Sequence, residues 1–230
     1  MLTPLILLPG LLCDAALWRA QIDALADVAA ASVADLTLDD TVGGMAGRVL
    51  AAAPPSFALA GLSMGGYVAF EIMRRAPERV TRLALFDTSA APDTDKRAAQ
   101  RRRLVESLKV GRFRGVTRRM LPELLHPSHV DGPVGEAVMA MAERVGADAY
   151  RRQQHAILSR PDSRPLLPAV SVPTLVAVGD GDRVTPIAKA REIHAGIAGS
   201  ALHLFEDCGH LPALEKPEET SALLREWLAS

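Results

Sequence analysis

The chain has 230 residues, of which 49% are hydrophobic and 23% charged, and its formal net charge is -1. This length and composition predict one globular domain, or a core with an inserted subdomain, and exclude a disordered chain. The near-zero charge argues against nucleic-acid binding, which depends on concentrated Lys and Arg. No apolar run approaches the roughly 20 residues that span a bilayer. With only two cysteines, we expect reduced thiols and a cytoplasmic protein.

Short apolar runs alternate with longer helical patterns along the chain. Continuous apolar runs are typical of strands covered on both faces, and strand–helix alternation predicts an α/β fold with a parallel sheet. The expected strands are 5–8, 33–38, 57–62, 80–86, 174–178 and 201–205. The expected helices are 41–53, 64–76, 187–197 and 217–229. Helix propensity accounts for Ala-rich patches such as 29–31.

The stretch between Ser89 and Val172 lacks this strand signal. It is rich in Arg and in helical patterns and is broken by several prolines, which favours an inserted helical cap. We therefore expect a core formed by residues 1–88 and 171–230, with a helical cap formed by residues 89–170.

The cap is also basic, since residues 90–165 contain 15 Lys or Arg and 9 Asp or Glu. One hypothesis is that these side chains attract an anionic acid or an acyl-CoA-like substrate. The alternative, which is the commoner role of charge runs at helical spacing, is a solvated face with ion pairs. The arginines considered for the first role are Arg101, Arg102, Arg103, Arg118 and Arg119.

The five residues from Gly61 to Gly65 read Gly-Leu-Ser-Met-Gly. They follow the apolar run 57–62 and open the helical run 64–76, which is the strand–turn–helix context of a nucleophile elbow. Small residues on both sides allow a tight, strained turn that presents Ser63 at the carboxyl edge of the sheet. An ordinary Gly-rich turn is the alternative interpretation. The motif predicts that Ser63 is a nucleophile.

A serine hydroxyl needs a base, and His210 is the candidate among six histidines. It lies in a loop with Gly209 and Pro212, directly after the last apolar run, where a polar side chain can be held over the sheet edge. The other histidines fall in the predicted cap, in a helical run or in a strand, where surface or packing roles are commoner. They are His126, His129, His155, His194 and His203.

An acid must orient this base, and three carboxylates follow predicted strands. Asp180 and Asp182 follow the strand 174–178, and Asp87 ends the strand 80–86. Gly and Asp clusters also shape turns, so either residue of the first pair could serve only that purpose. We favour Asp182 and keep Asp87 and Asp180 as alternatives.

At this point the sequence resembles the α/β-hydrolase family over essentially its whole length. The pieces that carry the resemblance are Leu5 to Gly10 with Trp18 downstream, the Gly61 to Gly66 elbow, Gly179-x-x-Asp182-x-x-x-Pro186, and Gly209-His210-x-Pro212 with Glu215-x-Pro217. Four motifs in the family's order are more specific than any one of them. A serine at the nucleophile position argues against the haloalkane dehalogenase and epoxide hydrolase branches, which use a carboxylate.

The resemblance implies an α/β-hydrolase fold with a shortened, mostly parallel sheet of about six strands flanked by helices, and an inserted helical cap. It implies Ser63, Asp182 and His210 as the catalytic triad. It also implies an oxyanion hole formed by the backbone N–H groups of Leu11 and Met64. Many relatives carry His-Gly where this chain has Pro9-Gly10, so the hydrogen bonds that fix the first loop are expected to differ.

These residues predict a serine hydrolase that cleaves a carboxylic ester through an acyl-enzyme, without metal or cofactor. A C–C bond hydrolase, a lactonase, a thioesterase or a cofactor-free lyase could use the same triad, and a non-catalytic small-ligand receptor could keep the fold. We expect a small-molecule substrate, no nucleic-acid or membrane partner, and a monomer or homodimer. Candidate substrate-binding residues, for which core packing is the alternative role, are Trp18, Phe113, Met120, Met139, Met141 and Tyr150. Cys13 and Cys208 are expected to be inert buried thiols.

Overall fold

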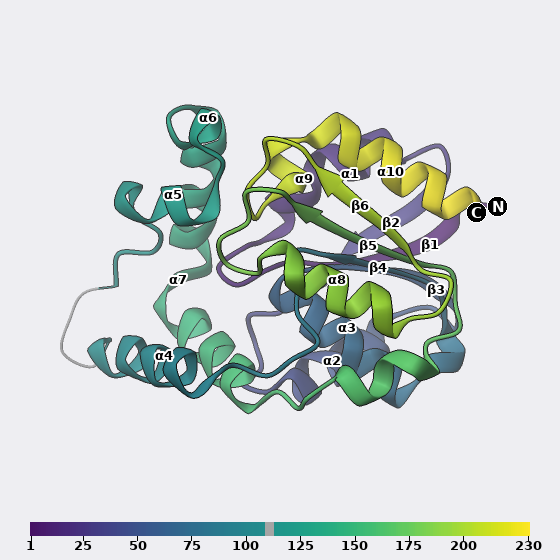
Figure 1. Ribbon diagram of the computed structural model, residues 1–230, viewed down its shortest axis with the longest axis horizontal. Coiled ribbons are helices and arrows are strands. Elements are labelled where there is room, and N and C mark those ends of the chain that lie inside the picture. The colour runs from purple at the N-terminus through teal and green to yellow at the C-terminus, as the bar shows by residue number, and fades with distance from the viewer. Residues whose placement is uncertain (109–112) are drawn as a thin grey trace.

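The computed structural model describes residues 1–108 and 113–230. Within these residues, six strands form one parallel sheet in the order β2-β1-β3-β4-β5-β6 (Figure 1). The strands are β1 (Thr3–Leu8), β2 (Ala29–Val33), β3 (Phe57–Leu62), β4 (Val80–Phe86), β5 (Thr174–Gly179) and β6 (Ala201–Phe205). The predicted α/β fold with a parallel sheet of about six strands is confirmed.

Helices cover both faces of this sheet (Figure 1). Helices α2 (Val42–Ala52), α3 (Met64–Arg75) and α8 (Ile187–Gly196) lie on one face, and α1 (Arg19–Ala24) and α10 (Pro217–Ala229) lie on the other. The helices predicted from the sequence agree with α2, α3, α8 and α10 to within one residue at each end.

The two faces of the sheet bury separate hydrophobic cores. Ile6 and Leu8 of β1 belong to the core beneath α2, α3 and α8, whereas Leu5 and Leu7 belong to the core that includes Trp227 of α10. Successive side chains of a strand point to opposite faces, so an unbroken apolar run supplies both cores. This explains why the buried strands were recognisable from sequence.

The prediction of a strand at 33–38 is wrong, and so is the helical interpretation of 29–31. Strand β2 occupies Ala29–Val33 and pairs with β1, with Ala29 opposite Thr3 and Val33 opposite Leu7. It is an edge strand of small, half-exposed residues, and its backbone pairing with β1 overrides the helix propensity of alanine. Leu36, which falls in the range predicted as a strand, is buried, but it lies in the loop that follows β2.

The segment between β4 and β5 is helical and stands beyond the carboxyl ends of the strands (Figure 1). Its α-helices are α4 (Asp95–Ser107), α5 (Leu121–Leu124), α6 (Pro127–Val130) and α7 (Pro133–Ser159). Helix α7 is kinked at Gly146, whose φ of 76° interrupts the helical backbone. None of the helices in the described ranges combines the length and apolar character that a membrane crossing requires.

Shorter elements complete the chain. Helix α9 is the single turn Pro212–Glu215 that follows the His210 loop. The short 3-10 helices are η1 (Ala15–Trp18), η2 (Pro77–Arg79), η3 (Arg118–Met120) and η4 (Arg164–Ala169).

Candidate active site

Ser63 occupies the sharp turn between β3 and α3. Its φ and ψ are 55° and -113°, a conformation that is costly for a residue with a Cβ and is maintained only when the surroundings enforce it. A Cβ at Gly65 would overlap the carbonyl oxygen of Leu8, and a Cβ at Gly61 would overlap the backbone at Gly65. Glycine at both positions therefore allows the strand and the helix to approach closely enough to form the turn.

His210 lies between Ser63 and Asp182 and is within hydrogen-bonding distance of both. Its Nε2 is 2.9 Å from Ser63 Oγ, and its Nδ1 is 2.8 Å from Asp182 Oδ2. A carboxylate can only accept, so Nδ1 carries the proton and Nε2 is left to accept from the serine hydroxyl. The three side chains are buried, at 9% exposure or less, which strengthens their mutual electrostatic interactions.

The carboxylate of Asp182 is held by further donors. Its Oδ1 accepts the backbone N–H groups of Val184 and Thr185 at 2.7 and 3.0 Å, and its Oδ2 accepts the Thr185 hydroxyl at 2.6 Å. Burial acts to raise the pKa of Asp182, but the charge of His210 and these hydrogen bonds outweigh it and hold the pKa well below its usual range. Asp182 is therefore an ionised partner for the histidine at neutral pH.

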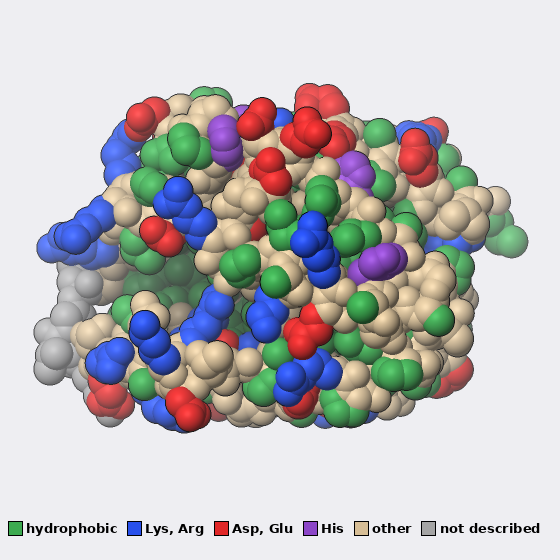
Figure 2. All heavy atoms as spheres, viewed as in Figure 1, with side chains coloured by type: hydrophobic (Ala, Val, Ile, Leu, Met, Phe, Trp, Pro, Cys, Tyr) green, Lys and Arg blue, Asp and Glu red, His purple; other side chains and the backbone are tan. Residues whose placement is uncertain are grey.

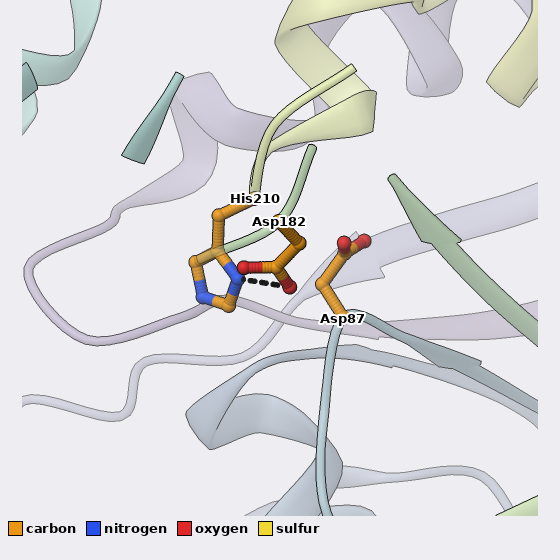
Figure 3. A group of neighbouring side chains, drawn as sticks. All are labelled: Asp87, Asp182 and His210. Atoms are coloured by element: carbon orange, nitrogen blue, oxygen red, sulfur yellow. Dashed lines mark hydrogen bonds and ion pairs between the residues drawn. The ribbon is translucent and has the colours of Figure 1, made fainter. Parts of the chain in front are cut away.

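Asp87 lies beside this pair but bonds elsewhere. Figure 3 shows Asp87, Asp182 and His210 projecting from loops that follow neighbouring strands, with the dashed contact joining only the last two. Asp87 is fully buried, and its Oδ1 accepts the backbone N–H of Gly179 at 3.0 Å. Its ligand oxygen, that of Asp182 and a His210 ring nitrogen lie within 4.8 Å of one another, which is also the spacing of a small metal site. The hydrogen bond between Asp182 and His210 accounts for the closeness of two of these three groups.

The third predicted carboxylate, Asp180, shapes a loop. Its Oδ1 accepts the backbone N–H of Cys208 at 3.1 Å and so connects the loop after β5 to the loop that carries His210. Of the three candidates, Asp182 is the one that the structure brings within hydrogen-bonding distance of the histidine.

Glu215 anchors the His210 loop, a role that the sequence motif did not reveal. This buried carboxylate accepts the backbone N–H groups of Gly209 and Leu211, on either side of His210, at 3.0 Å each. It also accepts the N–H of His126 at 2.8 Å. The His210 N–H donates to the carbonyl of Leu124 at 2.8 Å. The backbone on both sides of His210 is thus held in place. In the sequence, the only sign of this role was the presence of Glu215 shortly after His210.

The sequence predicts that the backbone N–H groups of Met64 and Leu11 form an oxyanion hole. Met64 is the first residue of α3, where an amide has no carbonyl one turn earlier to bond. Leu11 lines the same cavity as Ser63, and its amide has no hydrogen-bond partner among the described residues. Next to it, Leu12 has a positive φ of 60° and donates its N–H to the side-chain oxygen of Gln153 in α7. This hydrogen bond holds the loop after β1, in which Pro9 precedes Gly10.

A cavity of about 420 Å³ opens above Ser63 and His210, between the sheet edge and the inserted helices. Three of the residues predicted to bind substrate, Phe113, Met120 and Tyr150, line it. In Figure 2 the molecule is hollowed on this side, with hydrophobic side chains in its depth and Lys or Arg side chains at its rim. The size is that of an ordinary small-molecule site.

Three other residues of that set do not line the cavity, which corrects the expectation. Trp18 is fully buried and packs edge-on against Phe86, with ring centroids 5.7 Å apart. Met141 is also fully buried, and Met139 packs against the same core. These side chains pack in the hydrophobic core beneath the cavity. Core packing was the alternative role considered for them, and it is the commoner role of large apolar residues.

The cysteines are free and buried. Burial, with a smaller contribution from the charge of Asp14, raises the pKa of Cys13 to about 12. Burial likewise raises the pKa of Cys208. Thiols that stay protonated are poor nucleophiles, which agrees with the expectation that both are inert.

The chain resembles known proteins along nearly its whole length. A sequence model of the alpha/beta hydrolase family matches residues 5–223. The solved structure of a thermophilic esterase from Thermogutta terrifontis is 31% identical, with a TM-score of 0.89, and the match covers 99% of this chain and 89% of that one.

Curated relatives are matched over shorter shares of their length. A pimeloyl-[acyl-carrier protein] methyl ester esterase from Neisseria meningitidis is 28% identical over 174 residues, which are 73% of this chain and 55% of the relative. A monoacylglycerol lipase from Bos taurus is 30% identical over 185 residues, 76% of this chain and 55% of the relative. The chain thus spans little more than half of these two proteins. The match to the family model, together with the fold, shows that the chain belongs to the alpha/beta hydrolase family.

Proposed function

We propose that this chain is a serine hydrolase that cleaves carboxylic esters through an acyl-enzyme on Ser63. The observation that carries the proposal is the continuous series of hydrogen bonds from Ser63 Oγ through His210 to Asp182, with distances of 2.9 and 2.8 Å. A nucleophile, a base and an orienting acid in this order are what a serine needs to attack a carbonyl. The relatives named above as esterases or a lipase support the same reaction class.

In the proposed first half-reaction, His210 Nε2 takes the proton of Ser63 as Oγ attacks the ester carbonyl. The N–H groups of Met64 and Leu11 donate to the oxyanion, whose charge exists only in the tetrahedral state. The ionised Asp182 stabilises the charged imidazole, which returns its proton to the departing alcohol. Water then attacks the acyl-enzyme with His210 again as the base, and the free acid leaves.

We further propose that residues 89–170 act as a cap over this site. Helices α4 and α7 supply Arg101, Leu104, Tyr150 and Gln154 to the cavity wall, so the substrate pocket belongs partly to the insertion. A pocket shared between core and cap shields the reacting atoms from bulk water, which strengthens the electrostatic interactions on which the mechanism depends.

The decisive experiment is hydrolysis of p-nitrophenyl esters by the wild type and by Ser63→Ala. The variant should lose turnover while keeping the circular dichroism spectrum and melting temperature of a folded protein. Ser56→Ala, at an exposed serine just before β3, is the matched control and should keep full activity. Undiminished hydrolysis by Ser63→Ala would overturn the proposal.

The other reactions that the same triad could catalyse are distinguished by the substrates that are cleaved. A panel of esters, thioesters, lactones and C–C hydrolase substrates of graded size, run beside Ser63→Ala, identifies the bond that is cleaved. A fluorophosphonate probe distinguishes an enzyme from a non-catalytic receptor, because it labels only an activated serine. Failure to label Ser63 in the folded wild type would favour the receptor.

A further inference from the structure

The described part of the active-site cavity wall contains arginines but no carboxylates. Among the described residues that line it are Arg97, Arg101 and Arg114, and none is Asp or Glu. Arg97 and Arg101 lie four residues apart in α4, so they share one face of the helix. Only Arg101 belongs to the set considered from the sequence. The cap thus presents positive charge to the same cavity that contains Ser63.

This charge is only partly neutralised, because three guanidinium groups share one carboxylate. Asp93 lies 2.6 Å from Arg101, 2.9 Å from Arg160 and 3.8 Å from Arg97. The Asp93 and Arg160 side chains are each 6% exposed, and that of Arg101 is 12% exposed. Arg160 is also stacked over the Tyr67 ring, at 4.2 Å from its centroid. The Arg97 side chain is 37% exposed, so water screens its charge more than that of the others. The excess positive charge of the buried part of the cluster still favours a nearby anion.

The two arginines of α4 are held in place before any ligand binds. Arg101 donates from Nε to Asp93 and from Nη1 to the side-chain oxygen of Gln154 at 2.9 Å. Arg97 donates from Nη1 to the carbonyl of Val184 at 2.8 Å. Neither Nη2 has a hydrogen-bond partner within residues 1–108 and 113–230. Each guanidinium group therefore has N–H donors left for a ligand. Because its side chain is already ordered by these hydrogen bonds, ligand binding costs less conformational entropy.

We infer that Arg97 and Arg101 form an anion subsite for the free carboxylate of the substrate, whose ester carbonyl lies at Ser63. The inference rests on the proposed ester hydrolysis and names its substrate class: half-esters of dicarboxylic acids. The remaining wall suits the connecting chain, since Leu104, Val138 and Ile157 give it an apolar surface. Planar guanidinium groups match the geometry of a carboxylate better than a lone ammonium would.

The test compares charged and neutral substrates of equal length. The charged series consists of the mono-p-nitrophenyl esters of adipate, suberate and sebacate, which are long enough to limit attack by their own carboxylate. The neutral series carries a methyl ester at the same end. At the best length, the wild type should prefer the charged substrate in kcat/KM by at least about tenfold, the range of a charge-assisted hydrogen bond, and added salt should reduce the preference.

Arg97→Gln and Arg101→Gln should each lower this charged-to-neutral ratio several-fold. Arg102→Gln is the matched control, because Arg102 lies on the same helix, is exposed and does not line the cavity; its ratio should stay at the wild-type value. Melting temperatures are measured in parallel, because Arg101 also forms an ion pair with Asp93 and its loss could destabilise the fold. A wild-type ratio near one at every length, or an Arg101→Gln variant that loses both activities equally, would refute the subsite and leave the arginines a structural role.

Binding without turnover separates this inference from the proposed function. Titration calorimetry on Ser63→Ala with monomethyl and dimethyl esters of the same acid should show several-fold tighter binding of the charged ligand. If the wild type hydrolyses neither series but this preference holds, ester hydrolysis fails and the anion subsite stands. If the wild type hydrolyses both series without preference, the subsite fails and the hydrolase stands.

Discussion

The backbone N–H of Leu12 donates a 3.1 Å hydrogen bond to the side-chain oxygen of Gln153, a residue 141 positions later in the chain. Gln153 is fully buried in α7, and its side-chain nitrogen donates to the carbonyl of Leu36 at 3.2 Å. The side-chain amide of this one residue of α7 therefore joins the loop after β1, the loop after β2 and α7 itself. Through Leu12 it positions the neighbouring N–H of Leu11, the proposed oxyanion donor.

Replacing Gln153 by Met keeps the volume of the side chain but removes both hydrogen bonds. We expect kcat for a neutral p-nitrophenyl ester to fall roughly tenfold or more, since loss of an oxyanion donor costs about 3 kcal/mol and misplacement costs part of it. KM should change little, because the oxyanion forms only after binding. Labelling by a fluorophosphonate should slow in proportion to kcat. A lower melting temperature with unchanged kcat would show that Gln153 only connects the elements mechanically.

Asp87 should make the stability of the fold depend on pH. Burial, together with the charge of Asp182, raises its pKa well above the usual range. Because the folded-state pKa exceeds the unfolded value of about 3.9, the stabilisation from this group is complete below that value and is lost as the pH rises through the raised pKa.

The substitution Asp87→Asn should remove the loss of stability at rising pH, because asparagine does not ionise. An asparagine can accept the Gly179 N–H as Asp87 Oδ1 does, can donate to Asp182, and tolerates the positive φ of 44°. We expect its unfolding free energy to exceed that of the wild type at neutral pH and the two values to converge in acid. Chemical denaturation across pH measures this, with Asp23→Asn as the control at an exposed aspartate of α1. A variant that is less stable than the wild type at neutral pH would contradict the prediction.

Glu215→Gln should impair catalysis by loosening the His210 loop. The carboxylate accepts three backbone N–H groups, whereas an amide offers one oxygen and turns its NH₂ toward a donor. A buried N–H left unpaired costs about 1–3 kcal/mol. We expect a lower melting temperature and a clear fall in kcat. Glu206→Gln, at an exposed carboxylate just after β6, should change neither, and equal effects in both variants would argue against a positioning role for Glu215.

Two glycine-to-alanine substitutions should have opposite effects. Gly65→Ala places a Cβ on the carbonyl oxygen of Leu8, so the elbow must distort and both stability and activity should fall. Gly47→Ala lies inside α2, where the nearest neighbour of the new Cβ is an Arg75 nitrogen at 3.7 Å. It should stabilise the fold by about 0.5–1 kcal/mol by limiting the freedom of the unfolded chain. Thermal or chemical denaturation of both variants checks the pair.

The sequence by itself determined the features that depend on neighbours along the chain. The buried strands β3 and β4 were recognisable because an apolar run covered on both faces needs no knowledge of its partners. The Gly61 to Gly65 motif predicted the strained serine turn, since a Cβ at Gly61 would overlap the backbone of Gly65, only four residues later in the chain. The edge strand β2 was misplaced because its small, half-exposed residues carry no such pattern, and pairing with β1 alone makes them a strand.

Only the tertiary structure decided the features that join distant residues. Three carboxylates followed strands, and the distance from His210 distinguished Asp182 from the others. The contact of Gln153 with Leu12, the bond of Glu215 to His126, and the positions of Arg97 and Arg101 in the cavity wall depend on how the helical segment between β4 and β5 packs on the sheet. Spacing along a chain does not specify that docking, because it follows from the packing of many side chains at once.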